Sequence, residues 1–141
     1  MWKLMSSQTT FNEGSGRTTQ QSQRAQFVAC TRNPHTVFAR IVAPSVGERE
    51  AMIIANDISP ALGDAPAKAK WLVLDLSAVS VLSSMGLGMC VDLRNQARKQ
   101  GMKTVLYGLN GHLRDLFRMM KVERLYKVVH SKDDLNSLTG G

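Results

Sequence analysis

The stretch from Trp71 to Gly88 reads WLVLDLSAVSVLSSMGLG, and its hydrophobic pattern changes twice along its length. Residues 71–76 are apolar at nearly every position, which is typical of a central strand covered by helices on at least one face. Residues 77–85 are rich in serine and predict a loop. A helix is predicted from about Gly86 to Gln100, with Gly101 just beyond its end. This stretch therefore predicts a strand, a loop and a helix in succession.

Two adjacent serines, Ser83 and Ser84, lie just before this helix. A serine here can accept a hydrogen bond from a free N–H group of the first turn and so cap the helix, which is worth about 1 kcal/mol. The same N–H groups and the helix dipole stabilise an anion. A phosphate on such a serine adds roughly 1.5 to 2 negative charges that this position can hold. Both roles are open, and capping is the commoner one.

Two strands and a helix are predicted before this stretch. Residues 27–31 and 36–42 have strand-like composition, and Asn33-Pro34 between them is a turn signal, so the pair is expected to form a hairpin. Ser45, with Glu48 three residues later, matches a capping box. The helix that follows has one apolar face and is expected to end at Pro60 and Gly63. That face consists of Ala51, Ile54, Ala55 and Ile58.

Two further strands and two further helices are predicted after it. Residues 103–107 form the first strand, and a helix begins at Asn110-Gly111. Its apolar face consists of Leu113, Leu116, Phe117 and Met120. Val128-Val129 is a short last strand, and Asp133-Asp134 opens a small helix where acids suit the positive end of the dipole.

The elements therefore follow the order ββαβαβαβα. Alternation of this kind predicts an α/β sandwich, with a mixed sheet of four to five strands and helices mainly on one face. Residues 25–141 fit a single domain. Residues 1–24 are rich in Ser, Thr, Gln and Gly, and they are predicted to form a disordered arm because they carry little apolar surface to bury.

The excess positive charge is concentrated in one part of the sequence. Between Arg94 and Lys127 there are nine basic and two acidic residues, so this stretch accounts for the whole net charge of +7. Such a stretch can attract nucleic acid, anionic lipid or an acidic protein, or it can be a solvated helix surface. Aromatic residues are sparse within it and no helix-turn-helix pattern is present, so no direct contact with nucleic acid is expected.

Several other classes of function are disfavoured. Cys30 and Cys90 are not paired at metal-ligand spacing and the three histidines lie far apart, so no metal is expected. No phosphate-cradling Gly-rich loop is present, and no cofactor is expected. No nucleophile–base pair can be proposed, so the chain is not interpreted as an enzyme. No apolar run is long enough to span a bilayer, and a cytoplasmic location is expected.

The sequence resembles the STAS family, the bacterial anti-sigma factor antagonists. The family pattern is an apolar strand ending in Asp-Leu, a short loop, then Asp-Ser-Ser/Thr-Gly-Leu-Gly and a helix. Leu74-Asp75-Leu76 matches the strand end, and Gly86-Leu87-Gly88 matches the helix start. Ser84 falls on the serine that is phosphorylated in the family. Two positions differ, because Ser83 stands where the family has an acid and Met85 where it has a small hydroxyl residue.

The resemblance implies a non-catalytic protein-binding module. Its partner would be an anti-sigma factor of the ATPase-type serine kinase class, and phosphorylation at Ser84 would end binding. The implied partner-binding residues are Ser80, Ser83, Ser84, Met85, Gly86 and Gly88. The alternative is a phosphorylation-independent STAS subunit of a transport or signalling assembly, which the residues at 83 and 85 favour. The oligomeric state is left open.

Overall fold

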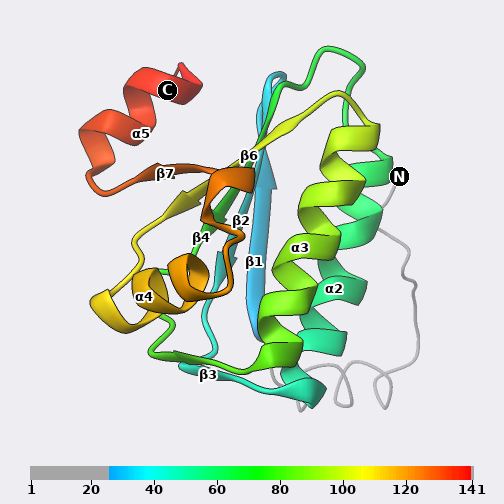
Figure 1. The fold of residues 1–141 in the computed structure, drawn as a ribbon. Coiled ribbons are helices and arrows are strands. Elements are labelled where there is room, and N and C mark those ends of the chain that lie inside the picture. Colours follow the sequence, from blue (N-terminus) through cyan, green and yellow to red (C-terminus); the bar gives the residue numbers. More distant parts are fainter. Residues whose placement is uncertain (1–25, 141) are drawn as a thin grey trace, which may run out of the picture.

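One five-stranded sheet organises the computed structural model, which describes residues 26–140 (Figure 1). The strand order is β1-β2-β4-β6-β7, with β1 antiparallel to β2 and every other neighbouring pair parallel. The strands are β1 (Val28–Arg32), β2 (Thr36–Ile41), β4 (Trp71–Asp75), β6 (Lys103–Tyr107) and β7 (Lys127–Val129). The predicted mixed sheet and N-terminal hairpin are confirmed, whereas the expected arm of residues 1–24 lies outside the described residues.

Strand β4 is buried on both of its faces, as its continuous apolar run predicted. Leu72 and Leu74 belong to the larger core, and Val73 between them belongs to a second, smaller core on the opposite face. All three side chains are fully buried. Strand β6 repeats this division, because Leu106 packs into the larger core and Val105 into the smaller one. The two central strands are thus covered on both sides.

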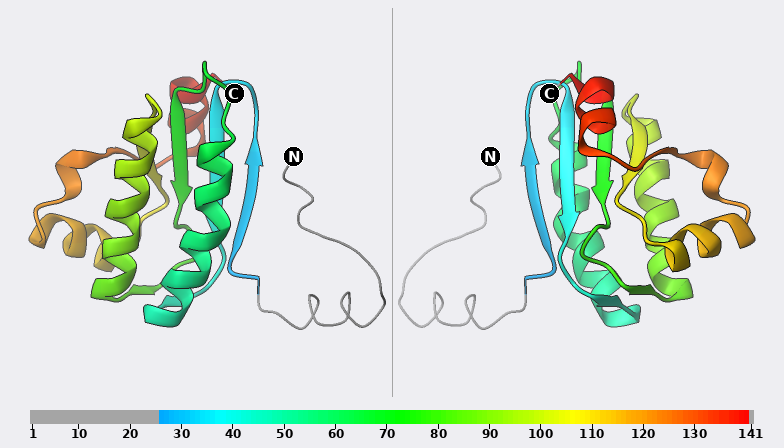
Figure 2. Two further views of the ribbon diagram at one scale, coloured as in Figure 1. Left: turned by 90° about the vertical axis from the view of Figure 1, so that its right-hand side faces the viewer. Right: turned by 90° about the vertical axis from the view of Figure 1, so that its left-hand side faces the viewer.

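The helices divide unequally between the two faces (Figures 1 and 2). Helices α2 (Glu48–Gly63) and α3 (Ser84–Lys99) lie side by side on one face, and α5 (Lys132–Thr139) covers the other. Helix α4 (Gly111–Met119) buries Leu113 and Phe117 in the larger core. A short 3-10 helix, η1 (Glu123–Leu125), leads into β7. The expectation of helices mainly on one face is therefore confirmed.

The start of helix α2 differs from the expectation. Ser45 does not cap it, because Ser45-Val46 forms a short strand, β3, instead. The N-cap is Gly47, and its backbone N–H donates to Glu50 Oε1 at 3.0 Å. Hydrogen bonds from the backbone N–H groups of Glu50 and Gly47 hold the pKa of the Glu50 carboxyl below its usual value. The helix also runs through Pro60, which lies within its last turn rather than ending it.

Residues 77–85 are not entirely loop. Val81-Leu82 forms strand β5, which pairs in parallel with β3 in a separate two-stranded sheet. Helix α3 begins at Ser84, two residues before the expected start at Gly86. These pairs are too short to give a strand signal in the sequence, because two residues cannot show an alternating pattern. The small sheet joins the connections that lead into α2 and α3.

Helix α3 lies very close to this small sheet at Gly86. A Cβ atom added there would lie 2.7 Å from Leu82 Cδ1 and 3.0 Å from the Val46 carbonyl oxygen. No atom lies within 4 Å of the corresponding Cβ position at Gly88, one half-turn along the helix. Packing therefore favours glycine at position 86 and not at position 88.

Two buried side chains test the assignment of the core. Leu74→Ala should lower the free energy of unfolding by roughly 2 to 5 kcal/mol, and Phe117→Ala by roughly 3 to 5 kcal/mol, because each leaves a cavity. Met119→Ala is the control, because Met119 is 70% exposed and should change stability by no more than about 0.5 kcal/mol. Urea denaturation measures all three, and an unchanged midpoint for Leu74→Ala would contradict the burial of β4.

The two glycines of α3 form a matched pair. Gly86→Ala should destabilise the protein by roughly 1 to 3 kcal/mol, because the new methyl group meets Leu82 and the backbone at Val46. Gly88→Ala should stabilise it by up to about 1 kcal/mol, because alanine has the higher helix propensity and the space is open. Thermal unfolding of both variants checks the difference. Equal effects would show that α3 does not depend on close approach at position 86.

Candidate partner-binding site

The connection from β4 to α3 is held in place by two polar side chains. Asp75 Oδ1 accepts hydrogen bonds from the Ser77 backbone N–H at 2.9 Å and from Ser77 Oγ at 2.6 Å. Its other oxygen lies 4.0 Å from Arg40 Nε. Asn110 Nδ2 donates to the carbonyl oxygens of Val79 and Ser80, both at 3.3 Å. Asp75, at the end of β4, therefore organises the loop that follows its own strand.

Ser83 and Ser84 have different positions at the start of α3. Ser83 is the N-cap, and its Oγ accepts a hydrogen bond from the Gly86 backbone N–H at 3.1 Å. Ser84 is the first helical residue and is exposed. Of the two serines that could cap the helix, Ser83 does so, and the helix begins two residues earlier than the sequence indicated. Ser84 is the first residue of the helix, where the free N–H groups and the helix dipole favour negative charge.

The charge at this helix start is also informative. The first turn of α3 contains no acidic residue. The partial positive charge of its N–H groups is therefore not offset by a carboxylate within that turn. An added phosphate at Ser84 would meet a favourable field from the helix itself.

Five of the six expected partner-binding residues are at least partly exposed to solvent near the start of α3. Ser80, Ser84, Met85 and Gly88 are exposed, and Ser83 is half-buried. Gly86 is buried on the side of α3 that faces Leu82 and the backbone of Val46. Gly86 thus positions the helix start, whereas the exposed residues present a surface.

A shallow apolar groove of about 580 Å³ begins at Ser84 and runs between α2 and α3. Three methionines on its rim are unusually accessible: Met52 is 59% exposed, Met85 50% and Met120 53%. Met120 was expected on the apolar face of α4, and it lies just beyond the end of that helix, where it borders the groove. The remaining lining is mostly aliphatic and includes Ala51, Ala55, Leu87, Met89 and Val91.

Sequence reasoning missed the part that α2 and α4 play in this groove. Met52 and Met120 lie more than thirty residues from Ser84 on either side, and only the packing of three helices brings them together. Methionine side chains are flexible and polarisable, and they adapt to different apolar surfaces. The only sign of this groove in the sequence is the number of methionines, which is eight in the full chain.

The remaining reactive groups do not form a second chemical site. Burial raises the pKa of the Cys90 thiol to about 12, and burial followed by the charge of Asp57 raises that of Cys30 to about 11. Both cysteines therefore stay protonated, as expected of structural thiols. Among residues 26–140, no cluster of three or more His, Cys, Asp or Glu side chains could hold a metal ion. Over the same range, no helix is both long and apolar enough to cross a membrane.

Solved structures with the same fold include several anti-sigma factor antagonists. A STAS domain protein of this class from Planctomyces limnophilus superposes with a TM-score of 0.71 at 13% identity, over 81% of this chain and 98% of that one. The Bacillus protein SpoIIAA in its phosphorylated form gives a TM-score of 0.61 at 13% identity, over 79% and 98%. The murine anion transporter Slc26a9 gives 0.66 at 16% identity, over 86% of this chain and 19% of the transporter.

At the sequence level, no curated protein matches this chain. The family model of the STAS domain matches residues 21–135. This match includes all five strands of the main sheet, the loop before α3 and both serines. The chain therefore belongs to the STAS domain family.

Proposed function

We propose that this protein is an anti-sigma factor antagonist that binds its partner through the Ser84 end of α3 and the adjoining methionine-lined groove. The observation that carries the proposal is the position of Ser84, which is exposed, opens a helix and borders an apolar groove. SpoIIAA, an anti-sigma factor antagonist, has been solved in both phosphorylated and unphosphorylated forms, which supports a switch by phosphorylation.

The partner would be an anti-sigma factor of the ATPase-type serine kinase class. In this mechanism the unmodified chain occupies the anti-sigma factor, and a sigma factor is released in the cytoplasm. The chain itself acts by binding and performs no catalysis. Exposed apolar side chains around the groove supply contact area, because methionine adapts to the partner's apolar surface.

Phosphorylation of Ser84 would act on the interface more than on the fold. The α3 N-terminus tolerates the new charge, whereas an apolar partner surface beside Met85 does not. Ser83 replaces the family's acidic residue and still caps the helix, because serine and aspartate are both good N-caps. A neutral Ser83 also removes one repulsive charge next to a phosphate on Ser84.

A phosphorylation-independent subunit of a larger assembly is the second candidate. The similarity to part of the Slc26a9 transporter supports it, because this domain covers only 19% of that chain. Met85, which replaces a small hydroxyl residue of the family pattern, also favours a constitutive apolar contact over a switch. The two candidates differ in whether Ser84 receives a phosphate.

Substitutions at Ser83 and Ser84 should have different effects, because Ser83 caps the helix and Ser84 is the proposed phosphate acceptor. Ser84→Asp should weaken binding to the purified anti-sigma factor by at least about tenfold, which corresponds to about 1.4 kcal/mol. Ser84→Ala should bind constitutively at unchanged stability, because the cap is Ser83. Ser83→Ala should remain a phosphoacceptor at Ser84 but lose about 1 kcal/mol of stability. Titration calorimetry and urea denaturation measure the two effects.

Phosphopeptide mass spectrometry after incubation with the partner and ATP identifies the modified residue. Phosphate on Ser84 supports the antagonist switch. Phosphate on Ser83, or on neither serine, would reject the switch and favour the second candidate.

The groove should contribute to binding independently of the phosphate. Met52→Gln and Met85→Gln should each weaken partner binding by roughly five- to tenfold, because a polar amide replaces an apolar contact. Met119→Gln is the matched control, since Met119 is 70% exposed but is not part of the groove lining. Equal affinities for all three variants, measured by surface plasmon resonance, would place the interface elsewhere.

A further inference from the structure

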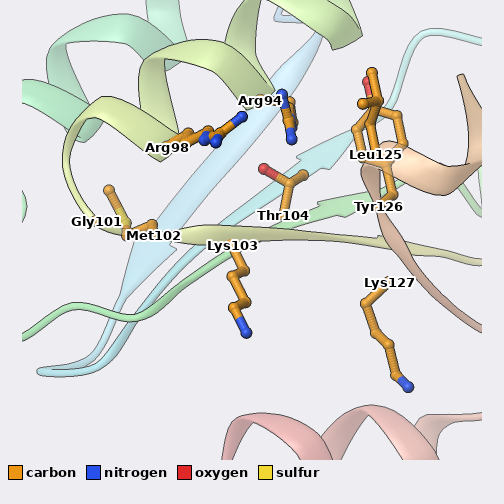
Figure 3. Close-up of a pocket in the computed structure, with 9 residues that line it drawn as sticks. All are labelled: Arg94, Arg98, Gly101, Met102, Lys103, Thr104, Leu125, Tyr126 and Lys127. Carbon is orange, nitrogen blue, oxygen red and sulfur yellow. The ribbon is translucent and has the colours of Figure 1, made fainter.

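A second concave site lies at the other end of α3, where the excess positive charge of the chain is concentrated. This pocket has a volume of about 500 Å³ and is bounded by the last turns of α3, the start of β6 and the segment that leads into β7 (Figure 3). Its cationic residues are Arg94, Arg98, Lys103 and Lys127, and no acidic side chain lines it. Volumes of this size are typical of pockets for small organic ligands.

Of the four cationic side chains, only the two arginines lie on the helix-covered side of strand β6. Figure 3 shows Arg94 and Arg98 extending from α3 above strand β6, whereas Lys103 and Lys127 extend to the opposite side of the strand. Arg94 and Arg98 are one helical turn apart, so their side chains share a helix face. Arg94 Nη1 also donates to the neighbouring Asn95 Oδ1 at 3.1 Å. The paired guanidinium groups are suited to the planar recognition of an oxyanion.

Two buried hydroxyl groups without partners belong to the same pocket. Among residues 26–140, only Thr36, Thr104 and Tyr126 have a buried side-chain oxygen with no hydrogen-bond partner. Thr104 and Tyr126 both line this pocket, and they are 3% and 9% exposed. Their side chains rise from the sheet on the side where the two arginines lie (Figure 3). An unpaired buried hydroxyl is uncommon, and a bound water, ion or ligand is one explanation for it.

We infer that this pocket binds a small phosphate ester. The phosphate lies between the guanidinium groups of Arg94 and Arg98, and the Thr104 hydroxyl donates to one of its oxygens. The organic part of the ester packs on the apolar side chains of Met102 and Leu125, which also line the pocket. A phosphate alone would leave much of the 500 Å³ unfilled. A concave pocket favours a small ester over an extended acidic peptide, which would need a longer groove.

This site is separate from the proposed antagonist surface. Arg98 lies fourteen residues along α3 from Ser84, which places the two about 21 Å apart along the helix axis. A ligand at the α3 C-terminus can therefore bind while a protein occupies the N-terminal end.

Phenyl phosphate is the probe that tests the proposal, with amide chemical shifts of the full chain as the readout at constant ionic strength. Saturable shifts are expected at residues 101–104 and 125–127. Arg98→Gln and Thr104→Val should each weaken binding by roughly tenfold, because each removes a hydrogen bond to a charged group. Arg114→Gln is the matched control, with the same loss of charge on exposed α4, and should change affinity by less than about twofold.

Thr104→Val also distinguishes a ligand-binding hydroxyl from a structural one. If the hydroxyl serves the ligand, this nearly isosteric change leaves the melting temperature of the free protein unchanged and removes only the affinity. A lower melting temperature with affinity retained would overturn the assignment. Vesicles containing phosphatidic acid test whether the phosphate belongs to a lipid headgroup. If the protein binds these vesicles, and Arg98→Gln and Thr104→Val each weaken that binding, the pocket takes a lipid phosphate.

Three other results would overturn the inference. One is the absence of saturable binding to both phenyl phosphate and the vesicles. Another is an equal loss of affinity in Arg98→Gln and Arg114→Gln, which would reveal attraction by net charge alone. The third is a hexaglutamate peptide that binds as tightly as the ester. Shifts centred on Ser84 instead would assign phosphate binding to the α3 N-terminus and leave the antagonist proposal intact.

Discussion

Burial of strand β4 on both faces is the constraint on which the rest of this fold depends. Its side chains alternate between two cores, and each core needs its own cover of helices. Helices α2 and α3 cover one face, and α5 covers the other (Figure 2). Strand β4 is central and parallel to both of its neighbours. At its C-terminal end the chain leaves the sheet and turns toward α3. The position of the candidate site follows from that turn.

The turn itself is specified by polar groups and by one glycine. Asp75 and Asn110 hold the loop through side-chain hydrogen bonds, and Ser83 caps the helix start. Gly86 lets α3 lie directly against Leu82 and the backbone of Val46. The Ser84 hydroxyl is then left at the surface, on a helix start that does not need it for capping. This separation of structural and exposed serines is what allows one position to be modified without loss of the fold.

The sequence predicted the long elements well, because helices and the buried strands have clear periodicities. Leu113 and Phe117 were placed correctly on the buried face of α4. The two-residue strands β3 and β5 could not be predicted, because pairing between distant residues creates them and no local pattern does. The same limit displaced the expected caps: once Ser45 is held in β3, Gly47 starts α2. The Ser83-Ser84 motif was enough to locate the site in the sequence. The methionine-lined groove could not be predicted, because it depends on how three helices pack together.

Helix α3 explains why the two ends of this domain favour different chemistry. Its N-terminal turn lacks acids, so the helix dipole stabilises negative charge at Ser84. Its last turn has Arg98 and Lys99, which offset the negative end of the dipole and continue into the basic stretch. A phosphate at Ser84 is therefore compatible with the folded helix, and its effect must fall on whatever apolar surface contacts Met85. An interface of this kind is switched by desolvation and charge at its edge, while the cores on either side of β4 remain unchanged.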